Sequence, residues 1–391
     1  MNAPDVLVVG AGIVGAACAY SCVRAGLRVA VVEAAGIGGG ATAAGMGHIV
    51  VMDDSEAQFA LTRSSQLLWQ ALLPELSPQA RKEIEYTPSG TLWVAADEEE
   101  MQEVRRKHAY YGARRVATEI LDSAALAAAE PNLRPGLAGA LLVPGDAVVY
   151  PPSAARWLLE RAGVVPRLGA AVASIGHGRA ALADGAVLSA GVIVNACGAA
   201  SPRLTPGLPI RPRKGHLLIT DRYPGWLRHQ LVELGYLKSA HASDGDSVAF
   251  NAQPRATGQI LIGSSRQFST EHEGEPTIGR RGAQPPERGA SRIDHAMLGR
   301  MLRRAEEYMP ALGALSAIRA WTGFRAATPD SLPLIGRAPA DPTVFLATGH
   351  EGLGITTSLA TGALVAAALC GAAPPIPAEP YLPNREVAHH A

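Results

Sequence analysis

The first part of the chain has the pattern of a strand, a helix and a second strand. An apolar, β-branched run at 5–9 predicts a strand, and the segment after it is compatible with a helix up to residue 25, where Gly26 is a typical stop. A second apolar run at 27–33 predicts another strand. A strand–helix–strand unit of about thirty residues places two parallel strands side by side, so the N-terminus is expected to begin a parallel sheet.

Helical and strand patterns continue along the rest of the chain. Helices are predicted at 55–73, 97–111, 153–162, 293–309 and 356–369, with Asp97 as the cap of the second. Strands are predicted at 91–95, 171–175, 187–195, 217–220, 248–251, 259–263, 319–324 and 344–347. Asp184-Gly185 predicts a hairpin turn between the strands at 171–175 and 187–195, and the Gly-, Pro- and Arg-rich segment 274–292 predicts a surface loop.

The order of these patterns predicts the fold class. Parallel-type patterns lie at the start, the middle and the end of the chain, and antiparallel-type patterns lie between them. We therefore expect an α/β protein in which a Rossmann-like domain is joined to an α+β domain with an antiparallel sheet, both discontinuous in sequence. The expected Rossmann-like parts are 1–53, 144–205 and 325–391, the last including a C-terminal tail, and the expected antiparallel parts are 54–143 and 206–324.

Composition and charge narrow the class of protein. The 391 residues carry 35 Lys and Arg against 35 Asp and Glu, which argues against binding nucleic acid or an acidic membrane through bulk charge. The four cysteines form no C-x-x-C pair or zinc-type cluster, so we expect no metal site and a reduced cytoplasmic protein, with peripheral contact at the inner membrane left open. No signal-peptide pattern is visible. The uncharged segment 352–378 predicts a buried helix, because its many small residues and Pro374-Pro375 argue against a membrane span.

Gly10-x-Gly12-x-x-Gly15 is the first motif that indicates chemistry. It follows a predicted strand and opens a predicted helix, which is the context in which such glycines let a pyrophosphate approach the helix N-terminus. Glu33 lies eighteen residues after Gly15, at the end of the second predicted strand. An acid at that place accepts hydrogen bonds from a ribose 2′-hydroxyl. The unit therefore predicts a dinucleotide site, for NAD or for FAD.

Three further segments of small residues suit a second, bulky part of a cofactor. Gly38-Gly39-Gly40-Ala41-Thr42 follows the second strand, and 192–198 runs from a buried strand into Ala and Gly. Taken alone, the first is also compatible with a surface loop and the second with a tight core turn. The segment 347–354 leads into the uncharged helix, whose N-terminus can stabilise the negative charge of a reduced flavin.

On these segments the chain resembles the glycine/D-amino-acid oxidase family of FAD-dependent oxidoreductases, over essentially its whole length. The resemblance is carried by 10–33, 38–47, 192–201, 321–336 and 348–354. It implies that the Rossmann-like domain binds FAD, that the first segment holds its ADP half, that the second and last flank the isoalloxazine, and that the other domain binds the substrate. The residues implied at the cofactor are Gly10, Gly12, Ile13, Val14, Gly15, Glu33, Ala34, Gly40, Ala41, Thr42, Gly45, Met46, Gly47, Val172 (at the adenine), Ala196, Gly198, Gly349, Glu351, Gly352, Leu353, Gly354 and Ile355.

Arg325 is the candidate for the substrate. It lies between a predicted strand and a turn in an apolar context, and an arginine can hold a carboxylate with two parallel hydrogen bonds. The resemblance implies that an arginine at this place binds the substrate carboxylate, and the open alternatives are pairing with Asp330 or exposure at the surface. His48, beside the expected flavin, is the second candidate catalytic residue. His48 can orient the substrate, attach covalently to the flavin, or be a packed or hydrogen-bonded histidine without a role in the reaction. The same alternatives are open for His350.

The sequence departs from the sarcosine-oxidase branch of the family. That branch carries a flavin-linked cysteine shortly before the Thr-Pro-Asp that stands here at 328–330, and the matching position in this chain is about Gly323. It also carries a lysine in the C-terminal glycine segment, and 349–356 contains none. We therefore expect the FAD to be bound non-covalently.

Within the family, the resemblance is closest to enzymes for cyclic or N-substituted D-amino acids, such as D-hydroxyproline dehydrogenase and opine oxidase catalytic subunits. It implies oxidation of a D-proline- or cis-4-hydroxy-D-proline-type substrate to the imine by hydride transfer to flavin N5. The alternative is a subunit of an opine oxidase or hydrogen cyanide synthase, with a glycine-type substrate, that passes electrons to a partner protein. A structural FAD protein is a third reading, against which Arg325 argues. The expected partners are a small amino acid and an electron-accepting subunit, with no nucleic acid and no transmembrane segment.

Overall fold

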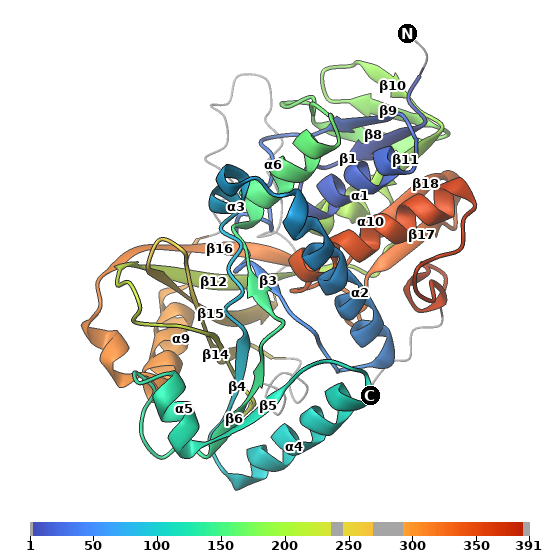
Figure 1. Cartoon of the computed structure of the whole chain (residues 1–391). Coiled ribbons are helices and arrows are strands. Elements are labelled where there is room, and N and C mark those ends of the chain that lie inside the picture. Colours follow the sequence, from blue (N-terminus) through green and yellow to red (C-terminus); the bar gives the residue numbers. More distant parts are fainter. Residues whose placement is uncertain (1–2, 236–244, 269–291, 386–391) are drawn as a thin grey trace.

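The computed structural model describes residues 3–235, 245–268 and 292–385, and it is built around two large sheets that lie one above the other in Figure 1. The upper sheet has the strand order β17-β18-β11-β1-β2. Its strands are β1 (Val6–Val9), β2 (Val29–Val32), β11 (Val192–Asn195), β17 (Leu334–Ala338) and β18 (Asp341–Thr348). All neighbours are parallel except β17 and β18. The expected parallel sheet is therefore present, and it draws its strands from the start, the middle and the end of the chain.

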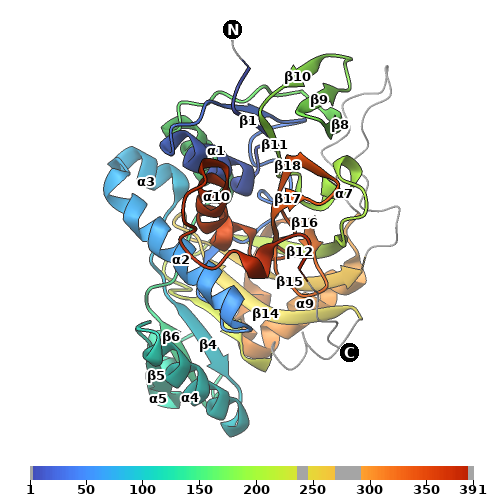
Figure 2. The same cartoon turned by 90° about the vertical axis from the view of Figure 1, so that its right-hand side faces the viewer.

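Helices cover one face of this sheet, and a small antiparallel sheet lies toward the other side (Figure 2). Helices α1 (Ile13–Arg24) and α10 (Gly354–Cys370) lie against the sheet. Behind them, α2 (Glu56–Leu72) packs on α10, α6 (Pro151–Arg161) packs on α1, and α3 (Pro78–Ile84) packs on α6. Both faces of β1 are thus covered, and all four of its residues are buried, which explains its continuous apolar run. The small sheet consists of β8 (Val172–Gly176), β9 (Arg179–Leu182) and β10 (Val187–Ser189).

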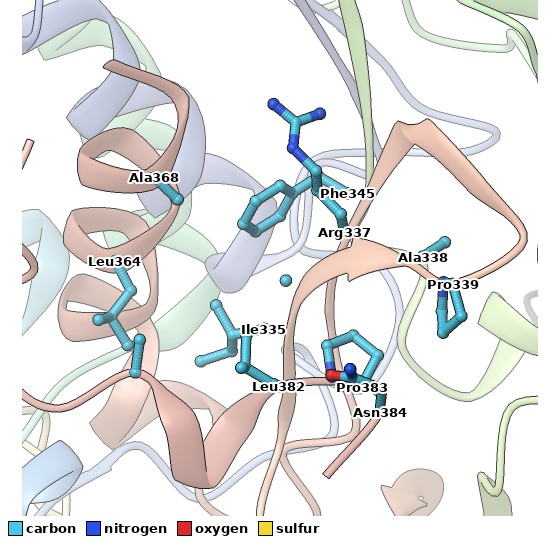
Figure 3. A pocket seen from close by; sticks show the side chains of 12 residues that line it. Ile335, Arg337, Ala338, Pro339, Phe345, Leu364, Ala368, Leu382, Pro383 and Asn384 are labelled. Atoms are coloured by element: carbon cyan, nitrogen blue, oxygen red, sulfur yellow. The ribbon is translucent and has the colours of Figure 1, made fainter. Parts of the chain in front are cut away.

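The uncharged helix α10 is buried against α1, as the sequence predicts. The two backbones are so close that a Cβ atom added at Gly362 would lie 2.4 Å from the carbonyl oxygen of Ala17. Within the residues that the structure describes, no helix has the length and apolar character needed to cross a membrane. A cavity of about 380 Å³ lies beside α10, between β17 and the segment at 378–384, and none of the predicted site residues lines it (Figure 3).

The strand predicted at 187–195 is wrong as a single element. The chain forms β10 in the small sheet, breaks at Ala190-Gly191, and then forms β11 in the parallel sheet. The break occurs because the N–H groups of Gly191 and Val192 bond to the carbonyls of Pro4 and Asp5, which brings the chain beside β1. The turn at Asp184-Gly185 is present, but it joins β10 to β9, which the pattern did not predict.

The lower sheet has the strand order β16-β12-β15-β14-β13-β4-β6-β5. Its strands are β4 (Thr91–Ala95), β5 (Glu119–Asp122), β6 (Gly139–Val143), β12 (Arg211–Arg222), β13 (Gln230–Glu233), β14 (Ser247–Pro254), β15 (Gln259–Phe268) and β16 (Ala317–Ala327). Neighbours are antiparallel except β13 and β4. The sheet is therefore largely the expected antiparallel one, although β16 runs through the expected boundary at 324/325.

The remaining elements pack on this lower sheet or connect it to the upper one. The helix α9 (His295–Tyr308) covers β14 and β15, while α4 (Glu98–Ala113) and α5 (Ser123–Ala129) pack beside β4, β5 and β6. Asp97 caps α4 by accepting the N–H of Glu100 at 2.9 Å, as predicted. The short elements are β3 (His48–Ile49), β7 (Ala147–Val148), α7 (Ser201–Leu204) and the 3-10 turns Leu73–Glu75, Gly198–Ala200, Pro310–Ala314 and Glu379–Tyr381. The loop expected at 274–292 lies, apart from Arg292, outside the described residues.

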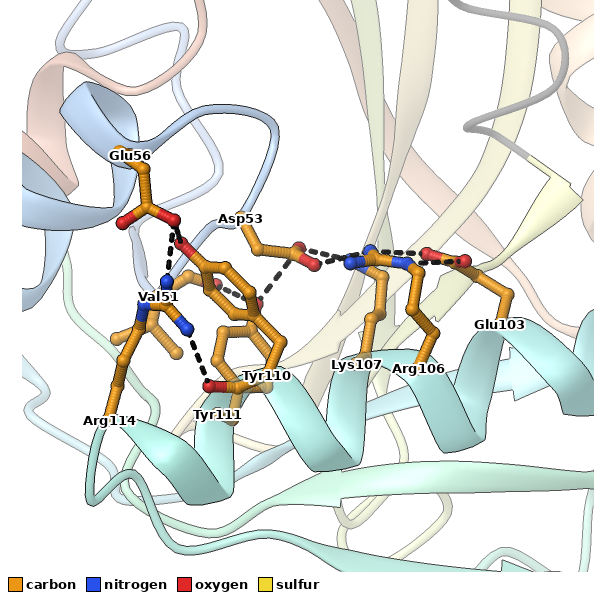
Figure 4. Close-up of polar contacts among 9 residues, drawn as sticks. All are labelled: Val51, Asp53, Glu56, Glu103, Arg106, Lys107, Tyr110, Tyr111 and Arg114. Atoms are coloured by element: carbon orange, nitrogen blue, oxygen red, sulfur yellow. Dashed lines mark hydrogen bonds and ion pairs between the residues drawn. The ribbon is translucent and has the colours of Figure 1, made fainter.

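Segment 50–53, which follows β3, is anchored to α4 by a buried ion pair (Figure 4). The Asp53 carboxylate pairs with Lys107, and these side chains are 1% and 0% exposed. Arg106 reaches the same carboxylate at 2.6 Å, and the Tyr111 hydroxyl donates to it at 3.1 Å. Burial alone would raise the pKa of Asp53, but Lys107 and Arg106 overcome this effect and hold it below its ordinary value of 3.8. The segment that follows His48 is therefore attached to α4, which packs on the lower sheet.

Candidate functional site

The predicted dinucleotide turn is built from close backbone contacts. Gly10 has a φ of 107°, and a Cβ atom there would lie 2.7 Å from the carbonyl oxygen of Ala196. A Cβ atom at Gly15 would lie only 1.9 Å from the oxygen of Gly10. The Thr42 hydroxyl accepts the N–H of Ile13 at 3.0 Å, so the loop at 36–47 closes over the start of α1. These contacts bring the glycine motif, Ala196 and Thr42 together as the sequence predicts.

Glu33 lies beside this turn at the end of β2. Its carboxylate accepts the N–H of Ala11 at 2.8 Å and the N–H of Ala35 at 2.9 Å. A carboxylate has about four acceptor positions, so two backbone bonds fix its direction and still leave room for ribose hydroxyls. The N–H of Glu33 bonds to the carbonyl of Arg167, and this contact draws the segment leading to Val172 along the same edge. Val172 therefore lies in a segment that is bonded to Glu33, and its contact with the adenine stays a prediction.

The segments expected around the isoalloxazine converge at the start of α10. A Cβ atom at Gly45 would lie 2.6 Å from Ile355 Cδ1, and one at Gly354 would lie 3.8 Å from Val14 Cγ2. The start of α10 has no side-chain cap, so its first N–H groups can face a negative charge. The loop, the glycine motif and the C-terminal segment thus form one cradle that fits a flavin dinucleotide. Of the predicted contacts, Ala34, Gly40, Ala41 and Gly352 are solvent-exposed.

Arg325 lies on β16 with its guanidinium over the neighbouring strand. A Cβ atom at Gly215 on β12 would come within 2.6 Å of its Nη1, so a side chain there would displace the guanidinium from this position. Nη1 donates to the carbonyl oxygen of Ser265 at 2.9 Å. Burial lowers the pKa of Arg325, and nearby Glu351 opposes that shift. The alternative pairing with Asp330 is wrong, because both oxygens of that carboxylate are bonded to Arg385 at 2.7 and 2.9 Å.

Glu351 joins the expected flavin segment to the strands that carry the arginines. Its backbone N–H bonds to the carbonyl of Ala326, and its carboxylate pairs with Arg213 Nη1 at 3.0 Å. Burial would raise the pKa of Glu351, but Arg266, Arg325 and Arg213 lower it below its ordinary value. One buried carboxylate is therefore surrounded by three guanidinium groups, and this surrounding favours binding of a further anion such as a substrate carboxylate.

His48 lies on β3, next to the loop that closes over α1. Its Nδ1 is 2.5 Å from Gln230 Oε1, and its Nε2 is 3.5 Å from Asn251 Nδ2. Burial lowers the pKa of His48 to about 4; the bond to Gln230 opposes the shift, and the charge of Arg325 adds to it. His48 is thus neutral at physiological pH. His350, in contrast, bonds to Thr361 at 2.9 Å inside the helix packing, where burial lowers its pKa to about 3.

Sequence reasoning missed several polar residues of the lower sheet that reach this site. Gln230 binds His48, Gln253 donates to the carbonyl of Met46, and Arg213 binds Glu351. A signal existed, because Asn251 and Gln253 alternate with apolar residues along one strand and so share a face. Gln230 could not be found in this way, since β13 itself was not predicted.

The fold and the site together define a protein with a Rossmann-type dinucleotide turn and a group of arginines beside it on the lower sheet. The profile of the DAO family, described as FAD dependent oxidoreductase, matches residues 5–368. The chain belongs to this family, and it is an FAD-dependent enzyme that oxidises amino acids at a CH–NH or CH–NH₂ group.

Similar proteins support this placement. Glycine oxidase from Geobacillus kaustophilus is 27% identical over 93% of this chain and 92% of its own length. Hydrogen cyanide synthase subunit HcnC from Pseudomonas protegens is 27% identical over 97% of this chain and 96% of its own. The crystal structure of the Geobacillus glycine oxidase superimposes with a TM-score of 0.81 at 25% identity, covering 99% of this chain and all of that one.

Proposed function

We propose that the enzyme oxidises the Cα–N bond of a cyclic or secondary D-amino acid, of the D-proline or cis-4-hydroxy-D-proline type, to the imine. The observation that carries this proposal is the position of the Arg325 guanidinium, which faces the region where the expected flavin segments converge. Among the described residues, this guanidinium donates a hydrogen bond to the backbone carbonyl of Ser265. A planar guanidinium can hold a carboxylate by two parallel hydrogen bonds. A D-amino acid dehydrogenase from Methylobacterium radiotolerans, 28% identical over 75% of this chain and 66% of its own, supports the D configuration.

The residues of the chain have separate tasks in this reaction. The turn at 10–15 and Glu33 would hold the ADP half of FAD, and the start of α10 would face the flavin ring. The bound FAD supplies the acceptor for the two electrons and the hydrogen that leave Cα. Arg325 binds the substrate carboxylate and so fixes where the Cα–H bond lies, which is the main contribution that this chain needs to make.

The position of Gly323 supports non-covalent binding of FAD. Gly323 lies on β16 and faces the loop at 36–47, where a Cβ atom added to it would come within 2.2 Å of Ala44 Cβ. A cysteine at this position would therefore collide with the loop before it could reach a flavin. This close approach supports a site without the covalent link that sarcosine oxidases make at the matching position.

A second candidate is a glycine-type substrate with electrons passed to a partner subunit. The hydrogen cyanide synthase subunit from Pseudomonas protegens covers nearly the whole chain, which favours this reading. We also propose that the enzyme works in the reducing cytoplasm, since all four cysteines, Cys18, Cys22, Cys197 and Cys370, are free thiols. Contact with the inner-membrane surface would come through the electron-accepting partner.

Anaerobic reduction of the purified holoenzyme tests these proposals. The substrates are D-proline, cis-4-hydroxy-D-proline, L-proline, glycine and pyrrolidine, and loss of the oxidised-flavin absorbance is followed for each. We expect the two D-imino acids to reduce the flavin fastest. Equal rates with L-proline would refute the D preference, and equal rates with pyrrolidine would refute the role of the carboxylate. Reduction by glycine alone would establish the second candidate in place of the first.

A further inference from the structure

A row of polar side chains crosses the lower sheet toward His48. Thr91 on β4 and Gln230 on β13 are direct partners in the parallel pairing of these strands, and they are 0% and 1% exposed. Asn251 lies on β14, the next strand of the sheet. Buried polar groups are stable only when they are hydrogen-bonded, so the bonds of this row determine how each group is oriented.

The bonds of Gln230 determine which nitrogen of His48 carries the proton. Gln230 Nε2 donates to Thr91 Oγ1 at 3.2 Å, which turns Oε1 toward His48 Nδ1 at 2.5 Å. An amide oxygen can only accept, so Nδ1 must carry the hydrogen. A neutral imidazole has one N–H group, and Nε2 of His48 is therefore a lone-pair acceptor.

Asp146 fixes the far end of the row. It is 0% exposed, and its Oδ1 accepts from Gln66 Nε2 at 2.8 Å and from the N–H of Val51 at 3.2 Å. Burial raises the pKa of Asp146 to about 7, and the nearby Thr91 hydroxyl and Gln66 amide oppose that shift. Because the Thr91 oxygen accepts from Gln230, its hydrogen is free to point at Asp146. The observed donors of the row thus point from His48 through Gln230 to Thr91, and Asp146 lies at its far end.

The near end of the row lacks a good donor. His48 Nε2 is 3.5 Å from Asn251 Nδ2, which is the outer limit of a hydrogen bond. The Oδ1 atom of Asn251 is buried and finds no hydrogen-bond partner. Arg325 lies close enough for its charge to act on the imidazole. A lone-pair acceptor thus lies near the guanidinium that is proposed to bind the carboxylate, and an amino acid offers an N–H group close to its carboxylate.

We propose that Nε2 of His48, oriented by Gln230, Thr91 and Asp146, accepts the N–H of the substrate amine, with Asn251 as its neighbour. This inference rests on the proposed function and assigns the second attachment point of that substrate. Attachment of the carboxylate to Arg325 and of the amine to His48 fixes two substituents of Cα. The positions of the Cα–H bond and the side chain then follow, and this is the basis on which the site distinguishes D from L substrates.

The neutral state of His48 also suits the chemistry of the amine. An imidazolium has no acceptor, so protonation of His48 abolishes the proposed bond. Among the described residues, Arg325 from β16 is the charged group that acts on His48, and Asp146 reaches it only through Thr91 and Gln230. A positive environment further favours the uncharged form of the amine, which is the form that can be oxidised.

The test replaces Gln230→Glu in the holoenzyme and follows flavin reduction by D-proline against pH. A carboxylate at this position raises the pKa of His48 toward neutrality. Protonation of the substrate amine lowers kcat/KM of both enzymes toward acid, so the readout is the ratio of the variant's kcat/KM to that of the wild type. We expect this ratio to fall about tenfold per pH unit on the acid side of the new His48 pKa, and to be constant if His48 does not contact the amine. The matched control Gln259→Glu, on β15, should behave as wild type. A Gln230→Glu profile identical to that of the wild type would overturn the inference.

A second variant separates amine binding from folding. Gln230→Leu frees the His48 tautomer, and it should weaken D-proline binding about three- to tenfold, the usual effect of one neutral hydrogen bond. Tetrahydro-2-furoate has the same ring and carboxylate but no N–H, so its Kd should change less than about twofold. Equal weakening of both ligands would show a merely structural role. If no amino acid reduces the wild-type flavin, the proposed function fails and the inference with it; wild-type activity with equal weakening refutes the inference alone.

Discussion

Replacement of Arg325 by lysine keeps the charge of the site and removes its planar geometry. Arg325 Nη1 is already bonded to the carbonyl of Ser265, which fixes the plane of the guanidinium and leaves its other N–H groups for a ligand. Lysine offers a single ammonium that can satisfy Ser265 or one carboxylate oxygen well, but it cannot make a two-pronged contact. The variant should therefore fold and bind FAD, yet hold the substrate carboxylate poorly.

The size of the effect follows from the bond that is lost. A hydrogen bond to a charged group contributes about 1.5–3 kcal/mol, which corresponds to a fall in kcat/KM of roughly ten- to a hundredfold. Misalignment of the Cα–H bond adds to this fall, because the remaining contact allows the substrate to rotate. The loss should appear in kcat as well as in KM, since the carboxylate contact also sets the reacting geometry.

The assay is anaerobic flavin reduction by D-proline, with FAD content and Tm measured on the same samples. Arg319→Lys is the matched control, because Arg319 lies on the same strand, is exposed and stacks on Trp321 at 5.2 Å. The control should keep kcat/KM within about twofold of wild type, as expected for an exposed position. A normal kcat/KM for Arg325→Lys would remove Arg325 from the substrate site, and loss of FAD would assign it a structural role.

Three further outcomes are expected. Glu33→Ala should weaken FAD binding by roughly ten- to a hundredfold through loss of a charged acceptor for the ribose, and an unchanged Kd in a fluorescence titration would contradict that contact. Acid precipitation should leave the flavin in the supernatant, and a yellow pellet would contradict non-covalent binding. Asp53→Asn should lower the free energy of unfolding by about 3–5 kcal/mol at neutral pH, because Lys107 stays buried without its partner. The folded-state pKa of Asp53 lies below 3.8, so its contribution is complete above that pH and is lost as pH falls through the lower value; the penalty in urea unfolding should shrink there, and growth toward acid would contradict the reasoning.

The cofactor side could be predicted from the sequence because its signals are local. Gly10, Gly15 and Glu33 lie within one strand–helix–strand unit, and their chemistry depends on neighbours only a few residues away. The three cofactor segments and Arg325 could be named as candidates for a similar reason, since each adjoins a strand or helix with a clear pattern. The structure adds that Asp330 pairs with Arg385. These residues are 55 positions apart, so no local sequence pattern predicts the contact.

The substrate side could not be predicted to the same depth. The role of Gln230 depends on its hydrogen bonds to Thr91, which is 139 residues away in the sequence, and to His48, which is 182 residues away. Those contacts depend on the parallel pairing of β13 with β4, and strand order is not encoded in the hydrophobic pattern of either strand. The strand predicted at 187–195 failed for the same reason, because the break at Gly191 depends on pairing with residues at the other end of the domain.

The backbone contact between Gly362 and Ala17 has a consequence for biosynthesis. Helix α1 (Ile13–Arg24) is synthesised long before α10 (Gly354–Cys370), which packs on it. Strand β1 likewise pairs with β11, which is synthesised later, and β11 pairs with β18, which is synthesised later still. Until α10 has been made, the nascent chain therefore carries the apolar helix α1 without its partner, and such a species is prone to aggregation. The cradle can retain FAD only after translation reaches α10, and a nonsense mutation anywhere before Gly354 yields a product without the start of α10.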